Sequence, residues 1–303
     1  FDLNSLYPHI IMQYNMSPET IVPHKVEDVD VDGLLEDKDY KMPNDTCMAA
    51  TGQCFSTTKP GIIPKLISDL YKERSSIKKE MLTISSENQI LKEKVERDLE
   101  LLEKANNLGD TRGNTSNVKQ LTEEEKKRHE EEFAKLQPIL KKIAKLDTKQ
   151  LALKILMNTL YGALSNEYFR YFDPRIAESI TVTGQYTIRS AEKAVNKYLN
   201  KVLKTSKVDY VIAIDTDSLY VNFGPFVNMM REKDWSEYDK NRIVDELSKF
   251  GENVMEELFR RTYTKLQNKM NCKTNMMEMK REKISDKGIW TGKKHYMLSV
   301  LDS

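Results

Sequence analysis

Cysteine and histidine are scarce in this sequence, long apolar runs are missing, and the net charge is close to zero. The three cysteines, Cys47, Cys54 and Cys272, are an odd number at spacings that fit no zinc site, and the four histidines form no cluster. We therefore expect reduced structural thiols and a reducing compartment. Because no run of 18 or more apolar residues is present, the sequence predicts a soluble intracellular protein without a membrane-spanning helix.

The balance of charge does not by itself indicate a partner. Lysine and arginine number 48 and aspartate and glutamate number 47, so the net charge neither favours nor excludes a nucleic acid. Because 31% of the residues are charged, the distribution of charge matters more than its total. The length of 303 residues is enough for one large domain or two smaller domains.

The first residues predict the end of a strand followed at once by a helix. Phe1-Asp2-Leu3 has strand character, and the stretch from Leu6 to Tyr14 is helix-like. A buried strand that began here would lose most of its ladder partners. We therefore expect the chain to be a piece of something longer, whether as one subunit of a naturally split protein or as part of a longer sequence.

The middle of the chain predicts two long helices. Residues 64–106 and 122–164 carry apolar side chains at near-helical spacing, and the second stretch begins with a capping-box pattern at Thr122 and Glu125. The polar segment 106–117 between them predicts a turn. The pattern indicates an antiparallel helical hairpin. Because the hairpin is rich in charge, one interpretation is an interaction arm or structural coiled coil without chemistry of its own.

The remainder alternates between helical and strand patterns. Helices are predicted over 176–203 and 241–267, and strands over 209–214, 219–223, 275–284 and 293–301. Because strands and helices do not alternate strictly, we expect an α+β fold with an antiparallel sheet into which the long helical hairpin is inserted.

Two carboxylates in the predicted strand hairpin are the first candidates for chemistry. Asp215 and Asp217 are separated by one neutral residue, so strand geometry would point both to one face. The apolar runs 211–214 and 219–221 on either side predict a buried hairpin with its acids at the edge of a core. Buried like charges need a cation between them.

A third carboxylate, Asp2, lies at a predicted strand end just before a helix N-terminus. Unpaired backbone N–H groups at such a terminus are suited to phosphate oxygens. Mg²⁺ prefers a few carboxylates together with phosphate and water. The sequence therefore predicts an acid for a metal next to donors for the phosphates that the metal would bridge.

Four motifs carry a resemblance to a known family. FDLNSLYP (1–8), KILMNTLYGALSN (154–166) and DTDSLYV (215–221) resemble motifs A, B and C of the family B DNA polymerases, and GKKHY (292–296) resembles their lysine-containing motif at the palm–thumb border. Order and spacing match, the similarity spans essentially the whole chain, and the subgroup that it resembles most is the replicative polymerases of T-even-like phages. The family is a DNA-directed DNA polymerase, a nucleotidyltransferase of DNA replication.

The resemblance implies roles for the residues around Asp2. Asp2 and Asp217 would bind two Mg²⁺ ions, with Leu3 contributing its backbone carbonyl and Asp215 acting as a supporting acid. The ions would promote in-line phosphoryl transfer to the primer 3′-hydroxyl. It further implies a triphosphate held by the amides of Ser5 and Leu6, and a sugar packed on Tyr7, which would exclude a 2′-hydroxyl.

The resemblance also implies a nucleotide-binding set on the helical hairpin and a few DNA contacts. The nucleotide-binding set would comprise Arg74, Lys78, Lys154, Asn158 and Tyr161. Tyr161 with Gly162 would lie beneath the nascent base pair, Lys294 and Tyr296 would contact the primer–template DNA, and Glu282 is a weaker candidate for an outer acid.

The domains and partners that the resemblance implies complete these expectations. Residues 1–60 would form the first part of the palm, 61–165 the fingers and 166–303 the second part of the palm, ending at the thumb border. The substrates would be primer–template DNA and deoxynucleoside triphosphates. The missing exonuclease-bearing and thumb segments would be supplied in cis or by a separate subunit, the isolated fragment would be weak or inactive, and the site of action would be the cytoplasm of an infected bacterial host.

Four positions depart from the family pattern, and one rival function stays open. His9 stands where a small residue is usual, Ile214 where glycine is usual, and Lys280 where the phage relatives often have an acid, while the loop over 285–290 looks shorter than theirs. Another two-metal nucleotidyltransferase, such as a reverse transcriptase or RNA polymerase, is the rival. Tyr7 beside Asp2 favours the DNA polymerase.

Overall fold

The computed structural model describes residues 1–97, 123–292 and 294–303. The turn predicted over 106–117 and the capping box at Thr122 lie outside these residues. The chain divides into two compact units, one formed by Phe1–Ser68 and Asn158–Ser303 and the other by Asp69–Met157. Among the described residues, no helix has the length and apolar character needed to span a membrane.

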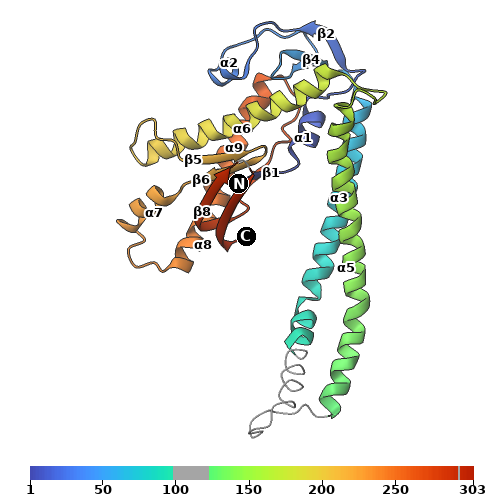
Figure 1. Ribbon diagram of the computed structural model, residues 1–303, viewed down its shortest axis with the longest axis vertical. Coiled ribbons are helices and arrows are strands. Elements are labelled where there is room, and N and C mark those ends of the chain that lie inside the picture. Colours follow the sequence, from blue (N-terminus) through green and yellow to red (C-terminus); the bar gives the residue numbers. More distant parts are fainter. Residues whose placement is uncertain (98–122, 293) are drawn as a thin grey trace. The chain divides into compact units, whose positions relative to one another are not determined.

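The first unit mixes helices with antiparallel sheets, as the α+β prediction requires (Figure 1). Its strands are β1 (Asp2–Leu3), β2 (Ile21–Lys25), β3 (Thr46–Met48), β4 (Gln53–Ser56), β5 (Val211–Asp215), β6 (Ser218–Val221), β7 (Met279–Lys280), β8 (Ile284–Gly292) and β9 (His295–Asp302). Its helices are α1 (Leu6–Gln13), α2 (Val31–Leu35), α6 (Pro174–Val202), α7 (Gly224–Arg231), α8 (Lys240–Phe250) and α9 (Glu256–Lys269), with a π-helical segment at Gly251–Met255.

The central sheet has the strand order β5-β6-β1-β7, and all of its pairs are antiparallel. Its two faces differ sharply in character. Leu3, Leu219 and Met279, from three adjacent strands, are buried on one face. Directly paired residues share a face and successive residues alternate, so Asp2 and its cross-strand partners Ser218 and Lys280 lie on the opposite face. The sheet thus keeps one apolar face and one polar face.

Helix α6 confirms its predicted apolar stripe. Ile176, Ile180, Val195 and Leu199 are fully buried, as expected for one side of an amphipathic helix. The helix begins where the sequence favours a start, because the Asp173 side chain accepts a hydrogen bond from the Arg175 N–H and proline follows as the first helical residue. Helices α1 and α9 and strands β5 and β6 pack against α6.

The C-terminal strands differ from the prediction. Residues 285–290, predicted as a loop, lie in β8, which pairs with β9 along its length. Of the strand predicted over 275–284, only Met279–Lys280, which is β7, and Ile284, which begins β8, are strand residues. Aspartate and glycine, here Asp286 and Gly288, have low strand propensity, so the local sequence did not predict strand β8. Pairing with β9 stabilises it. The Asn275 side chain accepts from the Met277 N–H, a local turn that competes with strand pairing.

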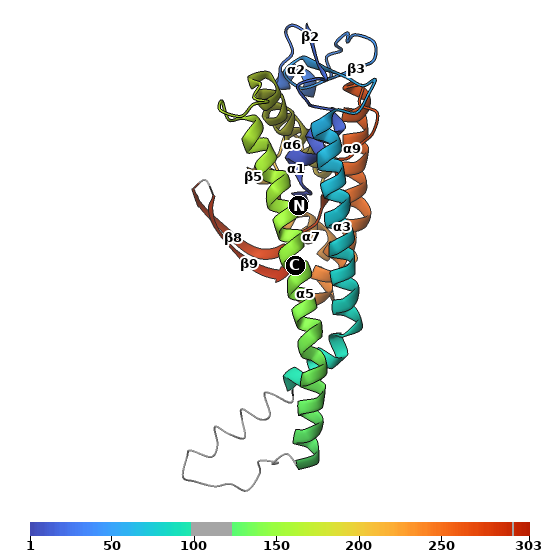
Figure 2. The ribbon, with the colours of Figure 1, turned by 90° about the vertical axis from the view of Figure 1, so that its right-hand side faces the viewer.

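The second unit consists of two antiparallel helical stretches. Helix α3 (Ile62–Glu87) and α5 (Glu123–Leu164) supply most of it, and residues 89–97 are helical again. Ion pairs join the two stretches, Glu73 to Lys149 at 2.8 Å and Glu80 to Lys142 at 3.0 Å. The falling partner numbers establish the antiparallel register, and Figure 2 shows both helices from a second side.

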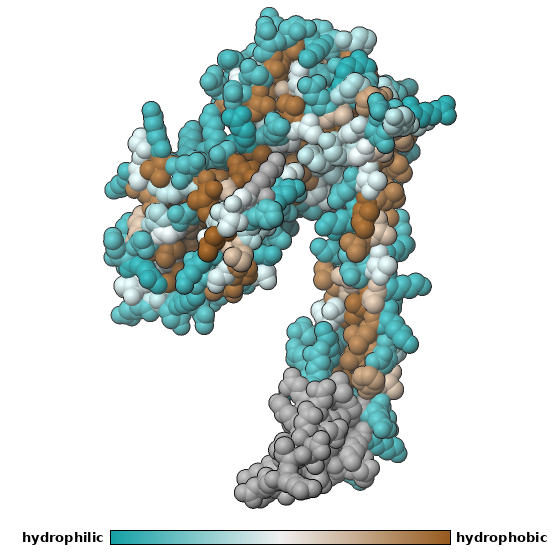
Figure 3. Space-filling model, in the orientation of Figure 1, coloured by the Kyte–Doolittle hydropathy of each residue, from teal (hydrophilic) through white to brown (hydrophobic). Residues whose placement is uncertain are grey.

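Apolar side chains run along this hairpin between charged margins (Figure 3). Ile77 and Val95 are buried, as expected of apolar side chains at near-helical spacing, whereas Leu66, which lies outside this unit, is 48% exposed. The predicted helix over 64–106 is interrupted at Asn88, whose side chain donates to the Ile84 carbonyl. Asparagine competes in this way for helical backbone groups.

Candidate metal and nucleotide site

A row of four residues crosses the polar face of the central sheet. The registers Asp215↔Ser218, Asp2↔Ser218 and Asp2↔Lys280 place one residue from each of the four strands side by side. The Ser218 hydroxyl donates to Asp2 Oδ1 at 2.8 Å. We call Asp215, Ser218, Asp2 and Lys280 the acid row. Asp2 and Asp215 therefore share one face although 213 positions separate them in the chain.

Asp217 lies next to this row, in the hairpin turn that the sequence predicts between the two strands. Thr216 and Asp217 form the two-residue connection between β5 and β6, and the Asp217 N–H donates to the Asp215 carbonyl at 2.7 Å. Thr216 has a φ of 57°, a conformation that is costly for a β-branched residue. The Asp217 carbonyl accepts from the Leu3 N–H at 2.9 Å, which fixes the turn to β1.

The prediction that the flanks of this hairpin are buried holds for only part of it. Leu219 is fully buried, but Ile212 and Ile214 on β5 are exposed. β5 is the edge strand of the sheet, so side chains on that strand have no neighbour beyond them. The acids of the hairpin lie at the surface of a core whose centre is β6 and β1.

Helix α1 begins directly after β1 and presents its N-terminus beside Asp2. Ser5 caps it in a left-handed conformation (φ 50°) without a side-chain capping bond, and Leu6 is the first helical residue. The N–H groups of such a first turn have no acceptor within the helix. The turn is anchored by the Asn4 N–H, which donates to the Glu278 carbonyl at 3.0 Å.

His9, one of the departures, is buried on α1 and supports the same turn. Its Nδ1 donates to the Asn4 carbonyl at 2.7 Å. Burial lowers the pKa of His9, although the bond to Asn4 and the nearby Glu278 oppose that shift. A neutral imidazole that bonds the backbone here fills a structural position next to the candidate site.

Tyr7 is held between an aromatic ring and a glycine. Its ring centroid lies 4.6 Å from that of Tyr161, with 31° between the planes. A Cβ on Gly184 would lie 3.3 Å from Tyr7 Cε1, so α6 approaches the ring closely. Burial raises the pKa of the Tyr7 hydroxyl, and Tyr161 and Asp217 add to the rise. The structure therefore brings Tyr7 and Tyr161 together, with α6 close to the Tyr7 ring.

An aromatic cluster connects the acid row with the β8–β9 hairpin. Tyr220 on β6 lies 5.4 Å, between ring centroids, from both Trp290 and Tyr296. Burial raises the pKa of Tyr220, and Tyr296, Asp215 and Glu282 raise it further. Lys294 lies in the turn between β8 and β9.

The predicted cations of the helical hairpin belong to the second unit. Arg74 Nε donates to Gln150 Oε1 at 3.2 Å across the two helices, while Lys78 and Lys154 are exposed. Asn158 and Gly162 belong to the first unit, and a side chain at Gly162 would meet no atom within 4 Å. An open glycine surface beside Tyr161 leaves room for a flat ligand.

Comparisons with known proteins identify the family of the chain. A family model described as DNA polymerase family B matches residues 1–96 and 119–232. The chain belongs to DNA polymerase family B. It is 34% identical to the DNA-directed DNA polymerase of Escherichia phage RB69 and 32% identical to that of Enterobacteria phage T4, in each case over 100% of this chain and 34% of the relative. DNA polymerase 1 of Pyrococcus abyssi is 27% identical over 77% of this chain and 20% of its own length. The chain thus spans about a third of the phage relatives that it matches.

The donors of this candidate site fit a hard divalent cation. Within the described ranges, no three His, Cys, Asp or Glu side chains are already arranged to hold a metal. The backbone bond from the Leu3 N–H to the Asp217 carbonyl joins the segments that carry Asp2 and Asp217, and both residues have carboxylate oxygens. Mg²⁺ is held by one or two carboxylates with water and substrate phosphates completing its shell. Asp2 and Asp217 are donors of the kind that such a shell requires.

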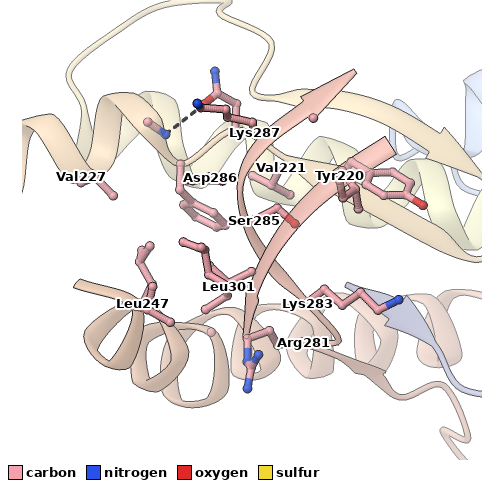
Figure 4. Close-up of a pocket in the computed structure, with 18 of the residues that line it drawn as sticks. Tyr220, Val221, Val227, Leu247, Arg281, Lys283, Ser285, Asp286, Lys287 and Leu301 are labelled. Atoms are coloured by element: carbon pink, nitrogen blue, oxygen red, sulfur yellow. Dashed lines mark hydrogen bonds between the residues drawn. The ribbon is translucent and has the colours of Figure 1, made fainter. Parts of the chain in front are cut away.

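A cavity of about 710 Å³ lies behind the β8–β9 hairpin and adjoins the acid row, because Ser218, Tyr220 and Glu282 line it. Figure 4 shows its apolar wall, to which Val221, Val227, Leu247 and Leu301 contribute. Asp2, Asp215 and Asp217 do not line this cavity, so the candidate metal site lies outside it.

Two members of the acid row were not predicted as site residues. Ser218 follows Asp217 directly, and its hydroxyl bonds Asp2. Lys280 was noted only as a departure from the family. Lys280 belongs to the row because β7 pairs with β1 in a register that places Lys280 opposite Asp2. The two residues are 278 positions apart, so no local sequence pattern predicts this pairing.

Proposed function

We propose that the chain is the polymerase core of a template-directed DNA polymerase, which adds deoxynucleotides to a primer 3′ end with two bound Mg²⁺ ions. The observation that supports it most is the acid row, with Asp217 and the α1 N-terminus beside it, in a chain of DNA polymerase family B. Membership in that family favours this function over another two-metal nucleotidyltransferase.

In this proposal Asp2 and Asp217 are the metal ligands, Leu3 adds its carbonyl, and Asp215 is the supporting acid. When bound, the two ions would activate the primer hydroxyl and stabilise the departing pyrophosphate. Ser218 orients the Asp2 carboxylate through its 2.8 Å bond. The protein holds both acids on backbone that is fixed by the sheet, which limits their reorganisation during the reaction.

The nucleotide would lie along the start of α1. The amides of Ser5 and Leu6 would bind triphosphate oxygens, which suit an uncapped helix N-terminus. Tyr7 would lie under the sugar, and its ring is kept in place by Tyr161 and the α6 backbone. The close support of that ring favours a steric role against a 2′-hydroxyl.

The two units correspond to different roles in the proposed enzyme. We infer that residues 1–60 and 166–303, which belong to the unit with the acid row, form the palm, and that residues 61–165, which include the whole second unit, form the fingers. Arg74, Lys78 and Lys154 would bind the triphosphate with Asn158, because charge-assisted contacts to phosphate are strong. Lys294 and Tyr296 would contact the primer–template DNA.

The complete enzyme is inferred to be larger than this chain. The phage relatives are about three times as long. We infer that exonuclease-bearing and thumb segments complete it, in cis or as a separate subunit, in the cytoplasm of an infected bacterial host.

Primer extension tests the proposal. The full-length protein that contains this chain is given a labelled primer–template, deoxynucleotides and Mg²⁺. Extension is expected, and Asp2→Asn and Asp217→Asn should each abolish it. Asp28→Asn is the matched control, because Asp28 is exposed on a turn at positive φ, where asparagine fits. Normal extension by Asp2→Asn would contradict the proposed site.

A further inference from the structure

Lys280 ends the acid row with a positive charge. It pairs directly with Asp2 across β1 and β7, so the two side chains share the polar face. Its neighbour Met279 is buried on the other face, which fixes this orientation. Directly paired Cβ atoms lie about 4.5–5.5 Å apart, so the ammonium is within reach of the Asp2 carboxylate.

A second carboxylate, that of Glu278, lies next to Lys280. The Lys280 Nζ is 3.0 Å from Glu278 Oε1, two residues back on the same side of the chain. Without Lys280, Asp2 and Glu278 would present two like charges on the β7 side of the row. Carboxylates arranged in this way attract divalent cations.

We propose that Lys280 keeps divalent cations off the β7 side of Asp2, so that an ion reaches Asp2 only from the side of the β5–β6 turn and Asp217. Lys280 is thus a residue that selects where the metal binds. This inference rests on the proposed function, because that proposal assigns Asp2 as a metal ligand. It assigns Lys280 no contact with the substrate.

Coulomb's law sets the size of the effect. A unit charge about 6 Å from a divalent ion changes the ion's affinity roughly tenfold in a water-like dielectric. Lys280→Gln should therefore strengthen Mn²⁺ binding roughly tenfold, and Lys280→Glu, which reverses the charge, roughly a hundredfold. Lys280→Arg keeps the charge and should bind as the unaltered protein does.

Titration of the 303-residue chain with Mn²⁺ alone, followed by electron paramagnetic resonance, tests the proposal. The expected result is tighter binding and one additional bound ion in Lys280→Gln and Lys280→Glu, with a gain that shrinks as salt is added. Lys25→Gln is the matched control, since Lys25 is also an exposed strand lysine but lies on the β2-β4-β3 sheet. A structural role for Lys280 predicts lower thermal stability in all three Lys280 variants and no gain of ions.

The double variant Asp2→Asn with Lys280→Gln separates this inference from the proposed function. The additional ion should be lost in it, because Asp2 is the shared ligand. Unchanged Mn²⁺ affinity and stoichiometry in both Lys280→Gln and Lys280→Glu would overturn the inference, whatever the unaltered chain binds. Failure of primer extension in the full-length protein would instead contradict the polymerase proposal and leave the ion titration decisive for Lys280.

Discussion

Replacement of Tyr7 by alanine should reduce discrimination between deoxyribose and ribose, with a moderate loss of stability. The Tyr7 ring is half-buried and makes one close ring contact, with Tyr161 at 4.6 Å. Such an aromatic pair contributes about 0.5–1.5 kcal/mol beyond its burial. Loss of a fully buried aromatic side chain typically costs about 3–5 kcal/mol. Because Tyr7 is only half-buried, we expect its replacement to lower the free energy of unfolding by about 2 kcal/mol. Removing a steric clash with a 2′-hydroxyl should restore about 1–3 kcal/mol, roughly 5- to 150-fold in discrimination.

The assay compares kcat/KM for a deoxynucleotide and the matching ribonucleotide in primer extension by the full-length protein. Tyr7→Ala should raise the relative use of the ribonucleotide and leave deoxynucleotide use within a few fold. Tyr198→Ala is the control, because Tyr198 is also half-buried and also contacts one aromatic ring, Phe250. Unchanged discrimination in Tyr7→Ala, with a stability loss like that of the control, would refute the steric role and leave Tyr7 as a packing residue.

Four further outcomes are expected. Lys154→Ala should raise the KM for the nucleotide or lower kcat, and the loss of transition-state stabilisation should be several kcal/mol at most. Unaltered nucleotide kinetics with weakened DNA binding would contradict the proposed role of Lys154. Ser218→Ala removes the 2.8 Å bond to Asp2 and should weaken Mn²⁺ binding about 10- to 100-fold with little change in Tm; equal affinity would show that the bond does not orient the carboxylate. Gly184→Ala places a methyl 3.3 Å from Tyr7 Cε1 and should cost about 1–3 kcal/mol of stability and shift sugar discrimination, whereas an effect on stability alone would mean that Tyr7 does not move. The 303-residue chain should extend a primer feebly, because phosphate contacts dominate DNA affinity and the chain spans about a third of its phage relatives; robust, processive synthesis would contradict this.

Features with a local signature were predictable from the sequence. The buried stripe of α6 follows from apolar residues at helical spacing, and both Asp173 and Pro174 mark its start. The β5–β6 hairpin follows from two β-rich runs joined by a short polar turn. The family motifs added the expectation that Asp2 lies beside this hairpin, which the β1–β6 pairing confirms.

Features that depend on distant partners were not predictable in this way. Residues 285–290 are polar and contain glycine, so only their pairing with β9 makes them a strand. Ile212 and Ile214 were expected to be buried, but they are exposed because β5 is an edge strand. Local hydrophobicity does not predict the order of strands in a sheet. Lys280 joined the acid row only through the β1–β7 register. The sheet order thus determined which residues share the site.

Anomalous diffraction from crystals of the full-length protein with primer–template, a non-hydrolysable deoxynucleotide and Mn²⁺ tests the central claim most directly. We expect two Mn²⁺ peaks beside the acid row, both in contact with Asp2 and Asp217, with the triphosphate at the N-terminus of α1 and no peak beside Lys280 and Glu278. Manganese bound away from Asp2 and Asp217, or a nucleotide bound elsewhere on the protein, would contradict the account.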